Sequence, residues 1–191
     1  MVVDNTQLKS NISNDKLMIQ EMLESHVETD VYPFATFSLF SRFVEFEQFV
    51  ISAYIQYALG EQSSSGFSPY IEIDFKNEEN LKMFHKPIDK FVTIKTIKDL
   101  YTVMFGDGIT VKNPFSSLFH NNYPDYEKLE SIRNLIAHKS PEAYEKFYNK
   151  CNNRAPCTLD DYLFRYNGAF ANYNMWLKFI ENMSDLIISP I

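Results

Sequence analysis

Chemistry-bearing residue types gather in one short stretch of this chain, SIRNLIAHKS, residues 131–140. An α-helix turns about 100° per residue, so Asn134 and His138 lie one turn apart on a common face, and Arg133 lies about 140° from His138. A flexible guanidinium can swing toward the imidazole, so the three polar groups could serve one small site. The opposite side of this helix is apolar and carries Leu129, Ile132, Leu135 and Ile136.

These residue types fit the cleavage of a phosphodiester bond in RNA. Histidine can take a proton from the 2′-hydroxyl, or give one to the leaving group, near neutral pH. Arginine can bind a phosphate through two hydrogen bonds and stabilise the charge that grows in the transition state. Asparagine can orient either group. Because the 2′-hydroxyl of the RNA would be the nucleophile, this chemistry requires no metal ion and no cofactor.

The same stretch has a second interpretation, as an amphipathic helix whose polar face is only solvated. A histidine near the C-terminal end of a helix is favoured by the helix dipole, without any catalytic role. Short motifs taken by themselves favour this interpretation. The spacing of the motif, a candidate buried acid and the helical pattern of the whole chain together favour the catalytic one.

Glu47 is that candidate acid. It lies within a stripe of apolar side chains whose three-four spacing predicts a buried helix face. The stripe consists of Phe37, Phe40, Val44, Ile51, Tyr54 and Ala58. An ionised carboxylate in such a place needs a partner, because unpaired burial is costly. We therefore expect Glu47 to pair with Arg133 or His138 and to orient it.

The stripe belongs to a long helix that is predicted from Pro33 to Leu59. Its far side is expected to be polar and carries Ser38, Arg42, Glu45, Ser52 and Gln56. Residues 1–30 are expected to form an N-terminal extension, in which Asp15 caps a short helix over residues 15–27.

Shorter elements are predicted between the long helix and the motif. Residues 61–69 read as a loop, and the alternation over residues 70–75 is typical of a short strand. A helix around residues 93–105 is expected to stop at Gly106 and Gly108. Residues 113–125 are expected to form a long loop before the motif helix.

The motif helix is predicted from Tyr126 to about Lys139, and the next helix from Pro141. Ser140 has the residue type of an N-cap and Pro141 that of the first helical position. The motif therefore lies at a junction between two helices.

The last helix is predicted to open with Thr158 and Asp161 as a capping box. Its apolar positions keep a heptad-like spacing to the end of the chain, through Leu159, Tyr162, Tyr166, Ala169, Tyr173, Trp176, Ile180, Met183 and Ile187. The aromatic residues among them are expected to pack in the core or a dimer interface. The fold class expected is all-α, an up-and-down bundle of four to five helices over residues 31–191.

Composition indicates a folded, soluble protein with room for one domain. The chain has 191 residues, of which 45% are hydrophobic and 23% charged. Polar and charged residues interrupt its longest apolar stretch, Phe34 to Leu59, so no membrane span is predicted. Residues 1–16 lack the apolar segment of a signal peptide, so we expect a cytoplasmic protein. The net charge of −7 argues against a surface that coats nucleic acid, so any RNA must meet a local positive site.

Metal and redox chemistry are not expected. Cys151 and Cys157 could be joined only across a short loop, and a cytosolic protein would keep them as free thiols. The spacing of cysteines and histidines is not that of a zinc site. We expect His26, His85 and His120 to be loop or surface residues.

RNLIAH, residues 133–138, resembles the signature of the HEPN superfamily (higher eukaryotes and prokaryotes nucleotide-binding). In this signature four residues separate an arginine from a histidine, and the first of the four is an asparagine. SRFVEFEQFV, residues 41–50, is similar to the first core helix of some HEPN groups, in which an acid lies within an apolar run. The resemblance spans residues 33–187, with the RiboL-PSP-HEPN-like group as the candidate subgroup.

Membership of this superfamily would imply a helical bundle, usually a homodimer, in which two copies of the motif meet to form a metal-independent ribonuclease site. Arg133 and His138 would be the catalytic pair, with Asn134 and Glu47 in supporting roles. Such proteins are commonly toxins, abortive-infection factors or other anti-phage components, so a cognate antitoxin, such as a nucleotidyltransferase, or a defence-system partner would be expected.

Two other functions remain open from the sequence. One is a catalytically inactive HEPN module that dimerises or binds a nucleotide or a partner protein. The other is a helical scaffold whose resemblance is accidental. The leading prediction is an endoribonuclease, and the residues do not name its RNA target or its trigger.

Overall fold

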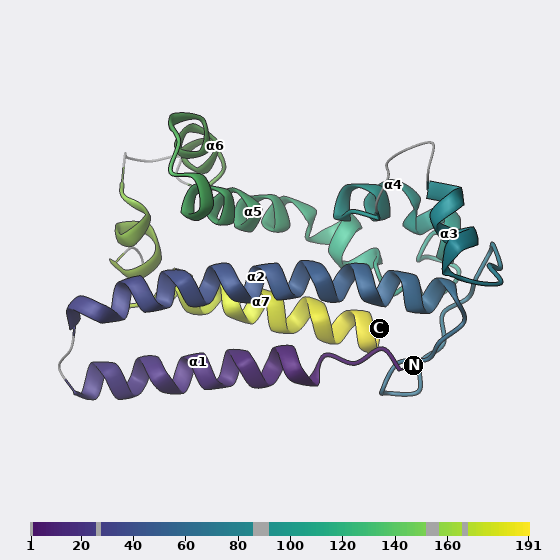
Figure 1. The fold of residues 1–191 in the computed structure, drawn as a ribbon, viewed down its shortest axis with the longest axis horizontal. Helices are drawn as coiled ribbons and strands as arrows, with labels where there is room; N and C mark the ends of the chain where they lie inside the picture. The colour runs from purple at the N-terminus through teal and green to yellow at the C-terminus, as the bar shows by residue number, and fades with distance from the viewer. Residues whose placement is uncertain (1, 26–27, 86–91, 152–156, 166–167) are drawn as a thin grey trace. The chain divides into compact units, whose positions relative to one another are not determined.

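The protein is all-α in the computed structural model, as expected. The described residues contain seven α-helices and two short π-helices, more than the four or five expected, and an isolated bridge between Val3 and Ser63 in place of any strand (Figure 1). None of the described helices is long and apolar enough to cross a membrane. The structure describes residues 2–25, 28–85, 92–151, 157–165 and 168–191.

Two compact units make up the chain. Unit 1 consists of Met1–Thr6, Phe46–Asn122 and Asn182–Ile191. Unit 2 consists of Gln7–Glu45 and Tyr123–Glu181. Helices α2 and α7 contribute residues to both. The expected boundary between an extension and a domain at residue 30 stays a prediction.

The longest helix, α2 (Glu28–Ala58), confirms the long helix predicted from the sequence. The predicted buried stripe is wrong, however, because Phe37 is 65% exposed, and only Tyr54 and Ala58 of the expected set are buried. The helix carries apolar residues nearly all round, so more than one three-four repeat can be drawn on it. Its buried apolar positions are Val31, Ala35, Leu39, Phe43, Phe46, Val50, Ala53, Tyr54, Tyr57 and Ala58.

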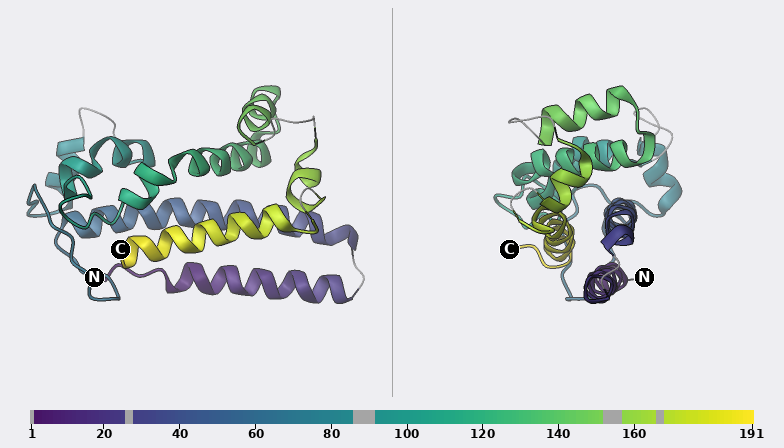
Figure 2. Two further views of the ribbon diagram at one scale, coloured as in Figure 1. Left: turned by 180° about the vertical axis from the view of Figure 1, so that it is seen from behind. Right: turned by 90° about the vertical axis from the view of Figure 1, so that its left-hand side faces the viewer.

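The N-terminal helix, α1 (Thr6–Glu24), is longer than the short helix predicted over residues 15–27. Asp15 lies inside this helix and is not its cap. Within unit 2, α1 runs antiparallel to α2, and α7 lies beside both (Figures 1 and 2). The apolar seam of α1 is thin and consists of Leu8, Ile12 and Ile19.

Unit 1 contains α3 (Glu78–His85), α4 (Ile94–Phe105) and the π-helix η1 (Ser117–Asn121). Residues 70–75 contain a bend and no strand, so the predicted strand is wrong, and α3 was not predicted. The expected loop over residues 113–125 is partly helical, because η1 lies within it.

Both ends of α4 follow the expected rules. The Thr93 side chain accepts a hydrogen bond from the Thr96 backbone at 3.2 Å, which caps the start. Gly106 ends the helix with φ +79°, and a Cβ there would lie 2.4 Å from a methyl carbon of Val111. Only glycine avoids both the backbone strain and the clash, so the predicted stop is confirmed.

The motif helix α5 (Tyr123–His138) and α6 (Pro141–Cys151) form the predicted junction in unit 2. The Ser140 hydroxyl accepts a hydrogen bond from the Ala143 backbone at 3.2 Å, so its N-cap role is confirmed. Lys139 adopts a left-handed conformation, with φ +48°, which turns the chain from one helix into the next.

Thr158 and Asp161 form the predicted capping box, because each side chain accepts a hydrogen bond from the other residue's backbone, at 3.1 and 3.4 Å. The prediction of one continuous last helix is wrong. The box opens the short π-helix η2 (Asp161–Arg165), and α7 (Ala171–Ile188) starts after Gly168 and Phe170, both at positive φ. Tyr166, expected on the heptad face, lies outside the described residues, whereas Tyr173 and Trp176 are buried as expected.

His85 is buried, which overturns the expectation of a surface residue. It is 1% exposed in unit 1, and its Nε2 lies 3.2 Å from the Tyr54 hydroxyl. Among the described residues, its Nδ1 has no hydrogen-bond partner. Burial lowers the pKa of His85 below its ordinary value of 6.5, so the ring is neutral in the folded protein at neutral pH. His120 is exposed as expected, and His26 lies outside the described residues.

We predict that His85 makes the protein less stable in mild acid. In the unfolded chain His85 takes up a proton as the pH falls below 6.5, while the folded protein keeps it neutral to lower pH. The unfolded state then binds more protons, so the free energy of unfolding decreases as the pH falls from 6.5 toward the folded pKa. Urea unfolding of wild type and His85→Gln between pH 7.5 and 5.5 should give a smaller decrease for the variant.

Met83→Ala, at a side chain 63% exposed on the same helix, supplies the control, because it removes no titratable group and should leave the pH dependence as in wild type. Parallel curves for wild type and His85→Gln would contradict the assignment.

Candidate functional site

Within unit 2, helix α5 presents the motif as the helical spacing predicts. Its buried side includes Leu129, Ile132 and Leu135. Arg133 and Asn134 are half-buried and His138 is exposed. The ring of Tyr126 packs on the ring of Phe43 in α2, with centroids 5.6 Å apart, and this contact fixes which side of α5 faces the core.

A hydrogen bond joins Arg133 to Asn134. Arg133 Nη1 donates to Asn134 Oδ1 at 2.7 Å. Neighbouring residues on a helix point in different directions, so the guanidinium must bend round the helix to make this contact. Asn134 shares its face with His138, one turn further on. The bond therefore ties the cationic group of Arg133 to a residue on the face that carries His138.

His138 is the last residue of α5 and is open to solvent. In the described part of the chain, no hydrogen bond joins it to Arg133 or Asn134, so the structure brings two of the three motif residues into contact and leaves the third beside them. An exposed imidazole can exchange protons with a substrate without first breaking a bond to the protein.

Glu47 is half-buried and belongs to unit 1, whereas the three motif residues belong to unit 2. Glu47 does not lie on a fully buried stripe, because α2 buries a different set of positions from the one expected. Its expected pairing with Arg133 or His138 stays a prediction.

A groove of ≈ 420 Å³ lies along the C-terminal half of α2 in unit 1. A larger one, of ≈ 590 Å³, lies in unit 2 at the end of the motif helix. Its walls come from α2, α5, α6 and the segment before η2, and include Phe37, Leu135, Ile136 and Tyr144. We call this larger pocket the junction groove, because Lys139, which follows His138 at the helix junction, also lines it.

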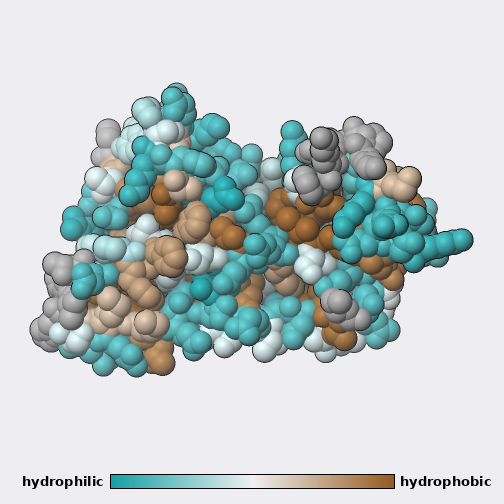
Figure 3. All heavy atoms as spheres, viewed as in Figure 1, coloured by the Kyte–Doolittle hydropathy of each residue, from teal (hydrophilic) through white to brown (hydrophobic). Residues whose placement is uncertain are grey.

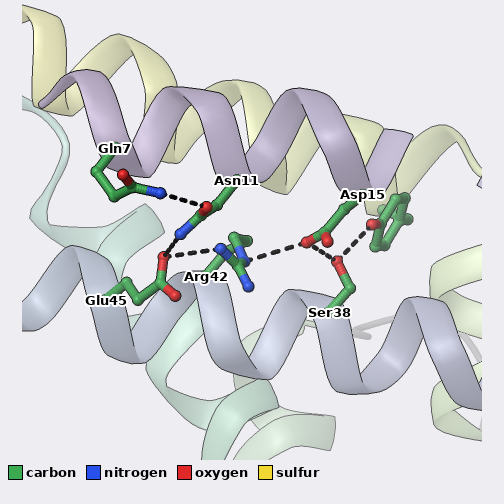
Figure 4. Close-up of polar contacts among 7 residues, drawn as sticks. Gln7, Asn11, Asp15, Ser38, Arg42 and Glu45 are labelled. Carbon is green, nitrogen blue, oxygen red and sulfur yellow. Dashed lines mark hydrogen bonds and ion pairs between the residues drawn. The ribbon is translucent and has the colours of Figure 1, made fainter. Parts of the chain in front are cut away.

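A polar network that the sequence did not predict joins α1 to α2 (Figure 4). Arg42 Nη1 donates to Glu45 Oε2 at 2.8 Å, and Arg42 Nε lies 3.1 Å from Asp15 Oδ2. The second contact is an ion pair, because the N–H direction does not suit a hydrogen bond. Asn11 Nδ2 donates to the same oxygen of Glu45 at 3.0 Å.

The network continues into α7. The Ser38 hydroxyl donates to Asp15 Oδ2 at 2.6 Å and lies 2.9 Å from the Tyr173 hydroxyl, which must then be the donor of that second bond. Burial raises the pKa of Tyr173 to about 12, so it stays protonated. Asp15 and Arg42 are 13% and 14% exposed, and the cluster lines neither groove. These contacts fix how three helices pack and show no opening for a substrate.

Sequence reasoning missed this network because it placed Ser38, Arg42 and Glu45 on a solvated side of α2. Their spacing of four and three residues does put them on one helix face. Asn11 and Asp15 on α1 have a matching spacing of four residues. Nothing in the sequence indicates that this polar pair faces α2, so the network could not be predicted.

Metal and thiol chemistry have no clear place in the described residues. These contain no group of three or more histidine, cysteine or acidic side chains that could hold a metal ion. Cys151 and Cys157 are both free thiols. Burial raises the pKa of Cys151, whose sulfur lies 3.5 Å from the Ser131 hydroxyl, so it is a poor nucleophile near neutral pH.

Comparisons of the chain with protein-family models, with curated proteins and with solved structures gave no match.

We predict that Arg42 stabilises the protein through the network. Arg42→Met keeps most of the volume but leaves two carboxylates without their cation, and breaking one side of a mostly buried ion pair costs about 3 kcal/mol. Lys82→Met is the matched control, because Lys82 and Glu78 form an exposed pair, 58% and 49% accessible, worth less than about 1 kcal/mol. Chemical denaturation of both variants measures the difference, and equal losses would contradict a special role for Arg42.

Proposed function

We propose that this protein is a metal-independent endoribonuclease of HEPN type that cuts RNA by 2′-hydroxyl transesterification and works as a homodimer. The observation that carries the proposal is the hydrogen bond from Arg133 to Asn134, the residue one turn before the exposed His138. A phosphate-binding cation is thus bonded to the residue that shares a helix face with a proton-transfer group. A place among toxins or anti-phage effectors, with a cognate antitoxin or defence-system partner, belongs to the same proposal.

The chemistry needs little beyond these groups. Neutral His138 accepts the proton of the 2′-hydroxyl as its oxygen bonds to phosphorus. Arg133 stabilises the extra negative charge on the phosphate oxygens. The bond from phosphorus to the 5′-oxygen breaks, and that oxygen takes a proton from a second, protonated histidine, which the other copy of the chain supplies. The products are a 2′,3′-cyclic phosphate and a 5′-hydroxyl.

We expect Arg133→Ala and His138→Ala each to lower RNA cleavage by a factor of about 100 or more, since one proton-transfer group accounts for roughly 10²–10⁴ in rate. The assay uses labelled single-stranded RNA in excess chelator, with product ends identified as cyclic phosphates. Lys9→Ala, on α1, controls for loss of a positive charge elsewhere on the molecule.

The outcomes separate the candidate functions. Equal cleavage by wild type and both variants would refute the site. No cleavage by any protein, with a stable dimer and no toxicity on expression in cells, would favour the catalytically inactive module. A monomer without activity would favour an accidental resemblance.

Two further variants test positioning. Asn134→Ala removes the hydrogen bond that Arg133 donates to Asn134 and should lower kcat about tenfold with little change in KM, because a hydrogen bond to a charged group is worth about 1.5–3 kcal/mol. Glu47→Gln should lower activity if its carboxylate supports the site. Unchanged stability and activity in Glu47→Gln would remove Glu47 from the proposal and leave Arg133 and His138 in place.

A further inference from the structure

The junction groove lies directly beside the candidate catalytic residues but contains none of them. Leu135 and Ile136 line it from α5, and Lys139 lines it from just beyond the end of that helix. Its volume of ≈ 590 Å³ is within the range of roughly 300–1,000 Å³ that is typical of small-ligand sites. All of its lining residues belong to unit 2, so its walls form one compact body.

Two aromatic side chains line this groove and remain accessible. Phe37 is 65% exposed and Tyr144 is 40% exposed. The Tyr144 hydroxyl donates to the Cys157 backbone carbonyl at 3.2 Å, and its ring contacts that of Phe147, with centroids 6.3 Å apart. Tyr144 is therefore held in place before any ligand arrives. Accessible aromatic rings are the groups on which proteins stack the unpaired bases of RNA.

Charged residues of both signs complete the lining. Lys139 follows His138 directly, and consecutive Cα atoms lie about 3.8 Å apart. Its ammonium is a phosphate-binding group. Asp160 supplies a carboxylate, which accepts hydrogen bonds from the exocyclic amino group of a base such as cytosine. Apolar walls, aromatic rings, one ammonium and one carboxylate match a single nucleotide.

We propose that the junction groove binds an unpaired, amino-bearing base of the RNA, next to the phosphate that is cut. This inference rests on the proposed ribonuclease function and names the element that selects its substrate. The base stacks on Phe37 and Tyr144, its amino group donates to Asp160, and Lys139 holds the adjoining phosphate near His138. Uracil lacks the amino group, so cytosine is preferred over uracil.

A protein partner fits the groove less well. Figure 3 shows brown and pale-brown surface over α5 and the N-terminal half of α2, interspersed with hydrophilic side chains. A specific protein interface buries about 800 Å² on each partner and carries few charges at its centre. The junction groove is the size of one small group and has Lys139 and Asp160 in its lining.

Binding is measured separately from cleavage. All proteins carry His138→Ala, and fluorescence anisotropy follows the binding of labelled hexacytidylate and hexauridylate. Phe37→Ala changes an exposed ring, so it should fold, and circular dichroism checks this. Asp160→Asn removes the negative charge. Met175→Ala, 47% exposed on α7 and outside the groove, is the matched control.

We expect hexacytidylate to bind at least about fivefold more tightly than hexauridylate. Phe37→Ala should weaken both about tenfold, as expected for loss of one stacking partner. Asp160→Asn should bring the two affinities within about twofold of each other, and Met175→Ala should change neither. In the enzyme with His138 intact, Phe37→Ala should raise KM and leave kcat almost unchanged.

The results distinguish this inference from the proposed function. If wild type cuts RNA but Phe37→Ala and Asp160→Asn bind both oligonucleotides like the control, the groove is not a base site and the ribonuclease stands. If no RNA is cut but Asp160→Asn still abolishes the preference for hexacytidylate, the groove stands and the ribonuclease falls. If Phe37→Ala changes only the oligomeric mass, the groove is an interface between copies and the inference is overturned.

Discussion

Arg42 is held between Asp15 and Glu45, and the packing of unit 2 depends on this arrangement. The apolar seam between α1 and α2 is thin, so apolar contact alone would allow α2 several rotations about its axis. The mostly buried Arg42 allows only one rotation of α2, because any other rotation leaves charged groups without partners. Ser38 extends the same constraint to Tyr173 in α7. Three helices are thereby fixed by polar contacts, with apolar burial supplying most of the favourable free energy.

The rotation of α2 determines what surrounds the motif. With Arg42 turned toward α1, Phe43 faces α5 and packs on Tyr126, which sets the inner side of the motif helix. The same rotation leaves Phe37 accessible at the junction groove. The outer side of α5 then carries Asn134 and His138. A contact on the far side of α2 thus controls both the orientation of the candidate site and the shape of the groove next to it.

Much of the local structure follows from local residue chemistry and was predicted from the sequence. Gly106 ends α4 because only glycine fits there, and Ser140 caps α6 because its hydroxyl satisfies a free backbone N–H. The predicted strand over residues 70–75 and the unbroken last helix were wrong. Residues 70–75 have an alternating spacing but no partner strand among the described residues. Most of the expected apolar positions of the last helix are buried, but Gly168 and Phe170, both at positive φ, interrupt the helix.

The sequence by itself determined the all-α class, the motif helix with its apolar inner side, and the junction that follows His138, because caps and helical spacing act over a few residues. Only the tertiary structure decided which side of α2 is buried, the burial of His85, the bond between Arg133 and Asn134, and the junction groove. Each of these depends on contacts between side chains that are distant in the sequence. An apolar helix such as α2 can bury any of several sides, and the ion pair between Asp15 and Arg42 determines which side is buried.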